Sequence, residues 1–421
     1  MASKRDIAKA DIANVGIERR VTKMDTKKYV VLRNSEILPP ARGDIGRARR
    51  AEMFPLEVTQ PIVKLEEAEL TKQESNDLRR DPRTLAIPKP MPMKLIAPVI
   101  STATAATTAA KSWGIDAVRA SESPFDGTDV TVAVLDTGID PNHPAFKGMK
   151  LVQKNFTTET GNDIHGHGTH CAGTIFGQDV NGIRIGIARN IKCALIGKVL
   201  DKDGGSSDTI AKAIQWAVQN GANVISMSLG IDFPGYVDYL VHEEGMDINP
   251  ATSQALEEYR ANVNLFTELS RVVAAQGPFG QSAIITAASG NESNRPKYEI
   301  AVSPPAAATG IVAVGALDKT DEGYTVAEFS NNQVNIAAPG VNIISAKAGT
   351  SDLVSMSGTS MATPHAAGIA ALWAQRQLKL TGRINNVSLM AQLIASGTFD
   401  SLAPGSEEDD VGTGIIQAPL K

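Results

Sequence analysis

Short apolar runs alternate with helix-like segments from about Trp113 onward, and this alternation limits the fold more than any other feature of the chain. Apolar strands separated by helices predict a mostly parallel sheet that is covered on both faces. Ligands of such sheets meet the carboxyl ends of the strands, so polar residues that follow a strand are the first candidates for a site. The strand candidates are residues 130–135, 191–198, 223–227, 283–287 and 311–314, and the helix candidates are a small-residue segment after 167 and residues 207–219.

Ser360 lies in a tight turn of small residues, Gly-Thr-Ser-Met-Ala-Thr-Pro-His at 358–365, which leads into an apolar helix. We expect Pro364 in the first turn of that helix, where a missing N–H is tolerated. A helix N-terminus favours negative charge, and so it suits an oxyanion. A serine hydroxyl is a weak nucleophile unless a base takes its proton, and a histidine base needs a carboxylate to orient it. The turn therefore predicts a partner histidine and a partner aspartate.

Both partners are found near the predicted strand ends. Asp136 directly follows the apolar run 130–135, and His167 begins the motif His-Gly-Thr-His. His165 is a rival base, but the small residues after His167 let its helix pack closely beneath the sheet edge. Each motif alone has a structural interpretation, whereas their joint occurrence favours a catalytic triad.

Together with Ala-Ala-Ser-Gly-Asn at 287–291, these motifs resemble the active-site signatures of the subtilisin-like serine peptidases, in that family's order Asp, His, Ser. The resemblance extends from about residue 113 to residue 418. It implies a nucleophile, a general base, an orienting carboxylate and an oxyanion hole. These are Ser360, His167, Asp136, and Asn291 with the backbone N–H of Ser360, respectively.

The resemblance also implies a cleft in which an extended peptide binds as an added strand, through main-chain hydrogen bonds that do not depend on its side chains. Glu292 would favour a basic side chain in the first specificity pocket; the alternative is a solvated surface glutamate. The implied substrate-binding residues are Ser228, Leu229, Gly230, Gly204, Gly205 and Gly290.

The first part of the chain resembles the inhibitory pro-segment of this family. Basic residues exceed acidic ones by seven in residues 1–111, whereas acidic residues exceed basic ones by twelve in the remainder, which favours docking of one part on the other. Within this part we expect strands at 28–33, 81–87 and 93–96 and a helix over 66–80. The expected divisions are a loose arm at 1–27, an α+β pro-segment at 28–96, a flexible linker and processing region at 97–111, and a peptidase domain at 112–421.

Other classes of site and partner find less support. The net charge of −5 argues against a nucleic-acid partner, and the absence of a signal peptide or membrane span predicts a cytoplasmic protein with no membrane partner. Cys171 and Cys193 are expected to be free buried thiols. Ala145 stands where the family often places a calcium-binding aspartate, although the loop 177–182 offers oxygen ligands. No metal is assigned and no cofactor is required, while structural calcium stays open.

We therefore predict a subtilisin-like three-layer α/β fold with a mostly parallel central sheet, preceded by a small α+β pro-domain. The predicted function is a serine endopeptidase that forms an acyl-enzyme on Ser360 and is made as an autoinhibited zymogen. Its partners are a peptide or protein substrate and its own pro-segment. The alternative is a catalytically silent peptide-binding scaffold of the same fold. Extra residues at 231–250 either restrict substrate access, make an oligomer contact or form a plain surface loop.

Overall fold

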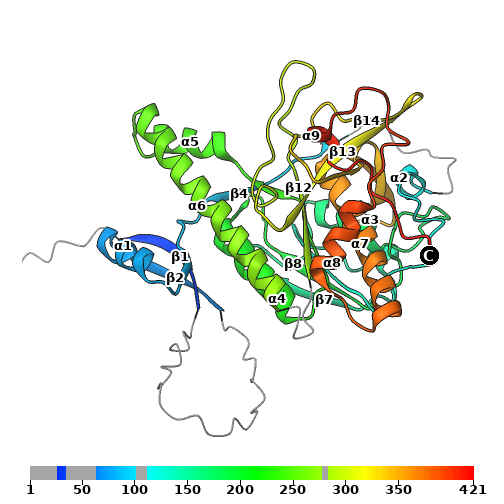
Figure 1. Ribbon diagram of the computed structural model, residues 1–421, viewed down its shortest axis with the longest axis horizontal. Helices are drawn as coiled ribbons and strands as arrows, with labels where there is room; N and C mark the ends of the chain where they lie inside the picture. The colour runs from blue at the N-terminus through cyan, green and yellow to red at the C-terminus, as the bar shows by residue number, and fades with distance from the viewer. Residues whose placement is uncertain (1–25, 35–62, 101–110, 277–282) are drawn as a thin grey trace, which may run out of the picture.

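The computed structural model describes residues 26–34, 63–100, 111–276 and 283–421 (Figure 1). The described residues from 111 onward, called the body here, are built on a sheet with the order β14-β13-β12-β10-β6-β8-β7, and β15 pairs with β13. All neighbours in this sheet are parallel except β14, which is antiparallel to β13. The strands are β6 (Thr131–Asp136), β7 (Leu151–Asn155), β8 (Cys193–Lys198), β10 (Val224–Met227), β12 (Ile284–Ala288), β13 (Ile311–Thr320), β14 (Gly323–Val326) and β15 (Ile336–Pro339).

The sheet is covered on both faces, as β6 illustrates. Val132 and Val134 pack into one hydrophobic cluster, whereas Ala133 and Leu135 pack into another. Successive side chains of a strand point to opposite faces, so a strand between two helix layers needs a continuous apolar run. One layer holds α3 (His167–Phe176), α7 (Thr359–Thr381) and α8 (Asn386–Ala395), and the other holds α4 (Ser207–Gln219) and α6 (Ile248–Ala275). The predicted three-layer α/β fold is confirmed.

The candidate site residues gather at one edge of this sheet. Because β6, β10 and β12 are parallel neighbours, their carboxyl ends meet there. Asp136 is the last residue of β6, Ser228 follows β10, and Asn291 lies three residues beyond β12. The helices α3 and α7 begin at His167 and at Thr359.

The described residues 26–34 and 63–100, called the front unit here, contact α4 and α6 of the body (blue in Figure 1). Three of its strands form an antiparallel sheet with the order β2-β1-β3. The predicted strand at 28–33 is confirmed. The predicted helix over 66–80 is wrong for 66–70, which pair with β1 as part of a strand, whereas Thr71 caps the helix that follows. The elements are β1 (Lys27–Asn34), β2 (Val63–Leu70), α1 (Lys72–Arg80) and β3 (Thr84–Ala86).

The rest of the front unit pairs with strands of the body. β4 lies between β9 and β11, and β5 pairs with β17, all in antiparallel fashion. Residues 99–100, expected in the flexible linker, are therefore strand, because their backbone groups extend the β16-β17 pair; 101–110 and nearly all of the arm 1–27 lie outside the described residues. The bounds are β4 (Pro92–Leu95), β5 (Val99–Ile100), β9 (Gly205–Ser206), β11 (Leu229–Ile231), β16 (Ile343–Ala346) and β17 (Leu353–Ser357).

The extra residues 231–250 are mainly helical rather than a plain surface loop. Asp232 caps α5 (Phe233–His242) by accepting from the N–H of Gly235 at 3.1 Å, and Leu240 packs with Ala251 of α6. Within the described ranges, no helix combines the length and the apolar character that crossing a bilayer requires. The remaining short elements are α2 (Trp113–Ala117), a 3-10 helix (Pro144–Phe146) and α9 (Glu408–Val411).

Candidate active site

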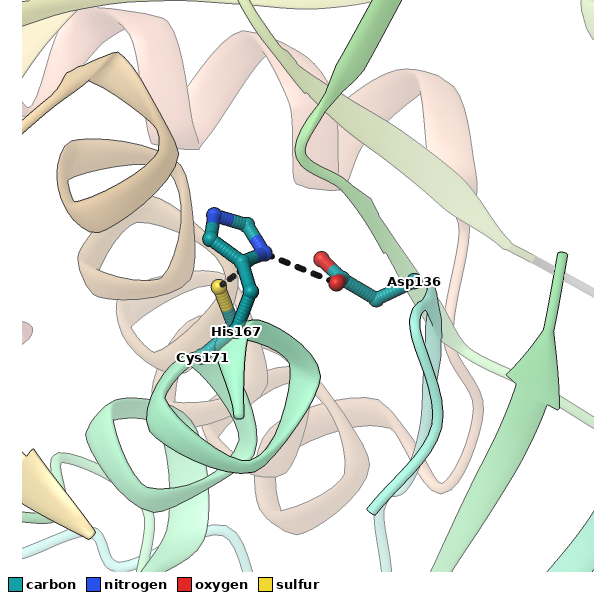
Figure 2. Close-up of side chains that lie close together, drawn as sticks. All are labelled: Asp136, His167 and Cys171. Atoms are coloured by element: carbon teal, nitrogen blue, oxygen red, sulfur yellow. Dashed lines mark hydrogen bonds and ion pairs between the residues drawn. The ribbon is translucent and has the colours of Figure 1, made fainter. Parts of the chain in front are cut away.

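Asp136 and His167 form a buried hydrogen-bonded pair (Figure 2). Nδ1 of His167 lies 2.8 Å from Oδ1 of Asp136, and the N–H of Thr137 donates to the same oxygen at 2.7 Å. Burial alone would lower the pKa of His167, but the charge of Asp136 raises this pKa well above its ordinary value. Because Nδ1 is hydrogen-bonded to the carboxylate, Nε2 is the ring nitrogen that remains to act on a neighbour. The rival His165 is exposed, and its ring centre lies 6.3 Å from that of His167.

A second buried carboxylate, Asp163, ties the end of β6 to the start of α3. Its Oδ1 accepts from the hydroxyl of Thr137 and the N–H of Gly166, both at 2.8 Å. Its Oδ2 accepts from the N–H of Thr169 at 2.8 Å and from the Thr169 hydroxyl at 2.6 Å. Gly166 has a φ of 87°, a conformation that other residues rarely adopt. The two segments that carry the buried pair are therefore fixed to each other by charge-assisted hydrogen bonds.

Lys198, at the end of β8, is a buried cation next to the same turn. Its Nζ donates to the carbonyl oxygens of Thr137 at 3.0 Å and Asn162 at 3.2 Å, and it lies 2.8 Å from Oε2 of Glu159. Its side chain is only 3% exposed. A buried ammonium group is stable only when it is paired and hydrogen-bonded, so Lys198 holds the turn after β6 and the loop after β7 together.

Ser360 is the second residue of α7, and Pro364 lies in the second turn of that helix. The prediction that Pro364 would lie in the first turn is therefore wrong, and its missing N–H deprives the carbonyl of Ser360 of its usual helical donor. That carbonyl accepts instead from the thiol of Cys171 at 3.4 Å and the hydroxyl of Ser228 at 3.2 Å. Two buried side chains from α3 and from the end of β10 thus support the turn that carries Ser360.

Cys171 lies one helical turn after His167 and, like Cys193, is a free buried thiol, as predicted. Burial raises the pKa of the Cys171 thiol, which therefore stays protonated and can donate to Ser360. Asp136, His167 and Cys171 lie close enough together to hold a metal ion (Figure 2). However, Nδ1 of His167 is already bonded to the carboxylate, and a protonated thiol is a poor ligand. The cluster fits a hydrogen-bonded pair with a supporting thiol better than a metal site.

The hydroxyl of Ser360 contacts the front unit rather than the imidazole. Its Oγ donates to the carbonyl oxygen of Ile96 at 3.0 Å. Among the described residues, Nε2 of His167 is buried and has no hydrogen-bond partner. Cys171 contacts both the ring of His167 and the carbonyl of Ser360, so these two residues are neighbours without a hydrogen bond between their side chains.

Asn291 contacts the front unit one residue after Ile96. Its Nδ2 donates to the carbonyl oxygen of Ala97 at 3.0 Å, and its Oδ1 accepts from both the N–H and the hydroxyl of Thr359 at 2.9 Å. The two bonds from Thr359 orient the amide so that its N–H groups face the cleft. The amide and the Ser360 hydroxyl therefore contact two successive carbonyls of the front unit.

The predicted cleft walls lie on the two sides of β4. On one side Leu229 and Gly230 belong to β11, and on the other Gly205 belongs to β9. At Gly204, which has a φ of 92°, a Cβ atom would lie 2.6 Å from the carbonyl oxygen of Met93, so no larger residue fits there. Ser228 lies below the cleft, where its hydroxyl bonds to Ser360. Gly290 has a φ of 122°, and a Cβ atom there would lie 2.2 Å from Nδ2 of Asn331.

Glu292 faces Lys94 of the front unit rather than Ile96, the front-unit residue that contacts Ser360. Its Oε1 lies 4.0 Å from Nζ of Lys94, and its Oε2 accepts from Asn331 at 2.8 Å. The side chain is 38% exposed, and it contacts both Asn331 and Lys94.

Several groups of the loop that suggested a calcium site have partners in the protein. Asp179 forms an ion pair with Arg189 at 2.9 Å, and Gln178 donates to the carbonyl of Arg189. Ala145 is buried, and its carbonyl accepts from the N–H of Gln178 at 2.8 Å. This donor set fits an internally paired loop better than a ring of oxygen ligands around a cation.

Sequence reasoning missed the supporting residues of the site, which are Asp163, Thr137, Lys198 and Ser228. One signal was available: Pro364 lies four residues after Ser360, so the carbonyl of Ser360 had to find a donor outside its helix. The other supporting contacts join segments that are far apart in the sequence, and no motif indicates them.

The site contains the groups that a serine hydrolase needs, which are a buried aspartate–histidine pair, a serine at a helix start and an amide donor. The model of the subtilase family matches residues 127–410, and the chain belongs to that family. It is a subtilisin-like serine protease of the α/β class, as the motifs predicted.

Named relatives agree with this assignment. The major intracellular serine protease of Bacillus subtilis is 31% identical over 295 residues, which cover 67% of this chain and 81% of that protein. The thermostable alkaline protease of Halalkalibacterium halodurans is 31% identical over 309 residues, or 72% of this chain and 71% of that protein. Subtilisin BL of Lederbergia lenta is 34% identical over 271 residues, or 63% of this chain and 84% of that protein.

Proposed function

We propose that this protease hydrolyses peptide bonds by attack of Ser360 on the substrate carbonyl. His167 takes the hydroxyl proton and later gives it to the leaving amine, while Asp136 fixes the imidazole tautomer and stabilises the imidazolium. The side chain of Asn291 and the backbone N–H of Ser360 stabilise the oxyanion. The observation that carries the proposal is the buried 2.8 Å contact between Asp136 and His167, next to the start of α7. Each of these groups belongs to the chain, so the reaction needs no cofactor.

The substrate binds as an added strand. Support comes from β4, which pairs on one side with Leu229 and Gly230 of β11 and on the other with Gly205 of β9. Main-chain pairing of this kind admits many peptide sequences and leaves selection to the few side chains that meet pockets or charges. Residues 112–421 form the peptidase domain that supplies these walls.

The front unit acts as an inhibitory pro-segment, with residues 28–96 as its folded part. In support, Ser360 donates to the carbonyl of Ile96, whereas Asn291 donates to the carbonyl of Ala97. Attack needs a single carbonyl that faces both the nucleophile and the oxyanion donor. Neither peptide bond meets this condition, so neither carbonyl is placed for attack while β4 keeps its pairing with the cleft walls, and cleavage within or near residues 97–111 requires a local rearrangement next to Ser360.

Opposite charges attach the front unit to the body. Lys28 lies 2.8 Å from Asp208 of α4, and Lys89 forms an ion pair with Glu258 of α6. Asn262 of α6 also donates to the carbonyl of Lys89 at 2.9 Å. These contacts agree with the charge excess of opposite sign in the two parts of the chain.

Expression of the wild-type chain beside Ser360→Ala, followed by intact-mass analysis, tests the proposal. The wild type is expected to lose about its first hundred residues and to react with a fluorophosphonate at Ser360, whereas the alanine variant stays whole and unlabelled. Ser406→Ala, which changes a serine remote from the cleft, is the control and should process normally. An unprocessed and unlabelled wild type would contradict the assigned roles and revive a silent scaffold.

The enzyme acts inside the cell, a proposal supported by the names of two relatives, the major intracellular serine protease of Bacillus subtilis and the intracellular serine protease of Paenibacillus polymyxa. Fractionation of the native host with an antibody to the body would test it. Recovery of the mature form mainly from the medium would contradict it.

A further inference from the structure

We propose that Asp232 and Glu292 form a subsite that selects a basic side chain at the third residue before the cleaved bond. This inference rests on the proposed function, in which Ser360 is the nucleophile and a peptide binds in place of β4. The subsite gives the enzyme a preference for a substrate side chain. This preference depends on the insert at residues 231–250 as well as on the cleft walls formed by β9 and β11.

The strand register fixes which substrate residue meets these carboxylates. Ile96 presents its carbonyl to Ser360, and Lys94, two residues earlier, pairs with Gly230 of β11. Alternate residues of an extended chain point to the same side, so Lys94 of β4 and Ile96, the residue after β4, point to one side while Met93 and Leu95 pack on the other. A substrate cleaved after the residue that replaces Ile96 therefore presents its third side chain where Lys94 now lies.

Both carboxylates approach the ammonium group of Lys94. Oδ1 of Asp232 lies 3.1 Å and Oε1 of Glu292 lies 4.0 Å from its Nζ. Each acid is held by another contact: Asp232 accepts from the N–H of Gly235 at 3.1 Å, and Glu292 accepts from Asn331 at 2.8 Å. The two negative groups are therefore already directed at this point before a cation arrives.

Lys94 leaves the cleft when the front unit is removed. Among the residues that the structure describes, no other basic side chain lies within ion-pair distance of Asp232 or Glu292. Two adjacent carboxylates then remain without a cation, and a substrate lysine or arginine restores the pairing. A substrate glutamate at the same position would meet like charges.

A cavity of about 390 Å³ beside Lys94 leaves room for a side chain longer than lysine. Its lining joins the two carboxylates to apolar groups of Phe233, Leu256 and Tyr259. An arginine stem can lie along the apolar wall while its guanidinium reaches the carboxylates, which are good bidentate partners for it. The subsite should therefore accept arginine at least as well as lysine.

Three fluorogenic tetrapeptide amides test this with the processed wild-type enzyme: Met-Lys-Leu-Ile, Met-Ala-Leu-Ile and Met-Glu-Leu-Ile, each cleaved after isoleucine. We expect kcat/KM to fall about three- to fivefold from lysine to alanine and by a similar factor from alanine to glutamate, because partly exposed ion pairs have modest strength. The preference should shrink in 0.5 M NaCl, since salt screens it. Equal kcat/KM values for the three peptides would overturn the proposal.

Substitutions locate the preference. Asp232→Asn combined with Glu292→Gln should bring the three kcat/KM values to within about twofold of one another. Asp238→Asn removes a carboxylate from α5, the helix that Asp232 caps, but that side chain is 71% exposed and contacts His242. This control should keep the full preference; a control that loses it as well would overturn the assignment to Asp232 and Glu292.

A second measurement does not depend on catalysis. In the full chain carrying Ser360→Ala, hydrogen exchange of the β4 amides should become several times faster with Lys94→Glu and stay unchanged with Lys94→Arg. Slow exchange in the Lys94→Glu chain would overturn the subsite. If no tetrapeptide is hydrolysed but this pattern appears, the catalytic proposal has failed while the subsite stands.

Discussion

The floor of the cleft means here the buried network of Asp136, His167, Asp163 and Lys198. This floor and the front unit that covers the cleft are held by different kinds of contact. On the floor, Asp163 is 6% exposed and the Lys198 side chain 3%, and each meets several partners. At the docking surface, the side chains of Lys28 and Lys94 are 45% and 42% exposed. Exposed ion pairs contribute at most about 1 kcal/mol each and weaken with salt, whereas loss of a buried charged partner costs several times more. The comparison indicates a floor that stays fixed while its cover can leave.

The largest expected effect comes from a change to the buried Asp136–His167 pair. Asp136→Asn should lower kcat by about 10⁴-fold, because an amide oxygen no longer imposes the required imidazole tautomer. A tetrapeptide assay under single-turnover conditions measures the loss in chemistry directly. Asp179→Asn, far from the cleft, is the control. A loss of less than tenfold would mean that the carboxylate does not orient the base.

The amide of Asn291 belongs to both regions, since its Oδ1 is held by the floor while its Nδ2 reaches the front unit. Asn291→Ala should lower kcat by about 10²–10³-fold with little change in KM, as expected for a donor that acts mainly in the transition state. A matching rise in KM with unchanged kcat would instead assign it to ground-state binding. Thermal unfolding of the variant separates this effect from loss of the bonds to Thr359.

Asp163 shows what the floor contributes without touching substrate. Asp163→Asn replaces one set of acceptor lone pairs with an N–H₂ group that faces N–H and O–H donors, so the free energy of unfolding should fall by about 2 kcal/mol. Displacement of the two segments should also reduce kcat, by up to about 10²-fold. Thr137→Val, which removes a single side chain from the network, provides a graded comparison by denaturant unfolding and pH–rate profiles. Unaltered kcat and stability in Asp163→Asn would contradict a positioning role.

The sequence was sufficient for the parts of the site that motifs record. Asp136, His167 and Ser360 are predicted as catalytic because each lies at a strand end or a helix start within a short run of small residues. Asp163 and Lys198 could not be found in this way, because their partners come from loops whose approach depends on tertiary packing. The same reason explains the error at 66–70, where pairing with β1 overrides a charged, helix-like composition.

The weakest expected effect belongs to the docking surface. Burial alone would raise the pKa of Asp208, but hydrogen bonds with Glu67 and Lys28 of the front unit, together with the hydroxyl of Ser206, hold it below its ordinary value. A carboxyl group whose pKa is lowered in the docked state strengthens docking above its free pKa, near 4, and this contribution is lost as the pH falls through the docked pKa. Acidification from about pH 5 toward pH 3 should therefore speed release of the cleaved front unit.

Lys28→Ala should loosen docking by only about two- to fivefold at pH 7, because the lysine is partly exposed, and it should flatten the acid dependence. The measurement is the delay before tetrapeptide hydrolysis begins after processing, followed at several pH values and at low and high salt. Lys202→Ala, on an exposed loop of the body, should leave both the delay and its pH dependence unchanged. If Lys28→Ala delays release instead, or if salt slows release, the front unit is held mainly by its apolar contacts with α4 and α6. Buried contacts would then hold the front unit as they hold the floor.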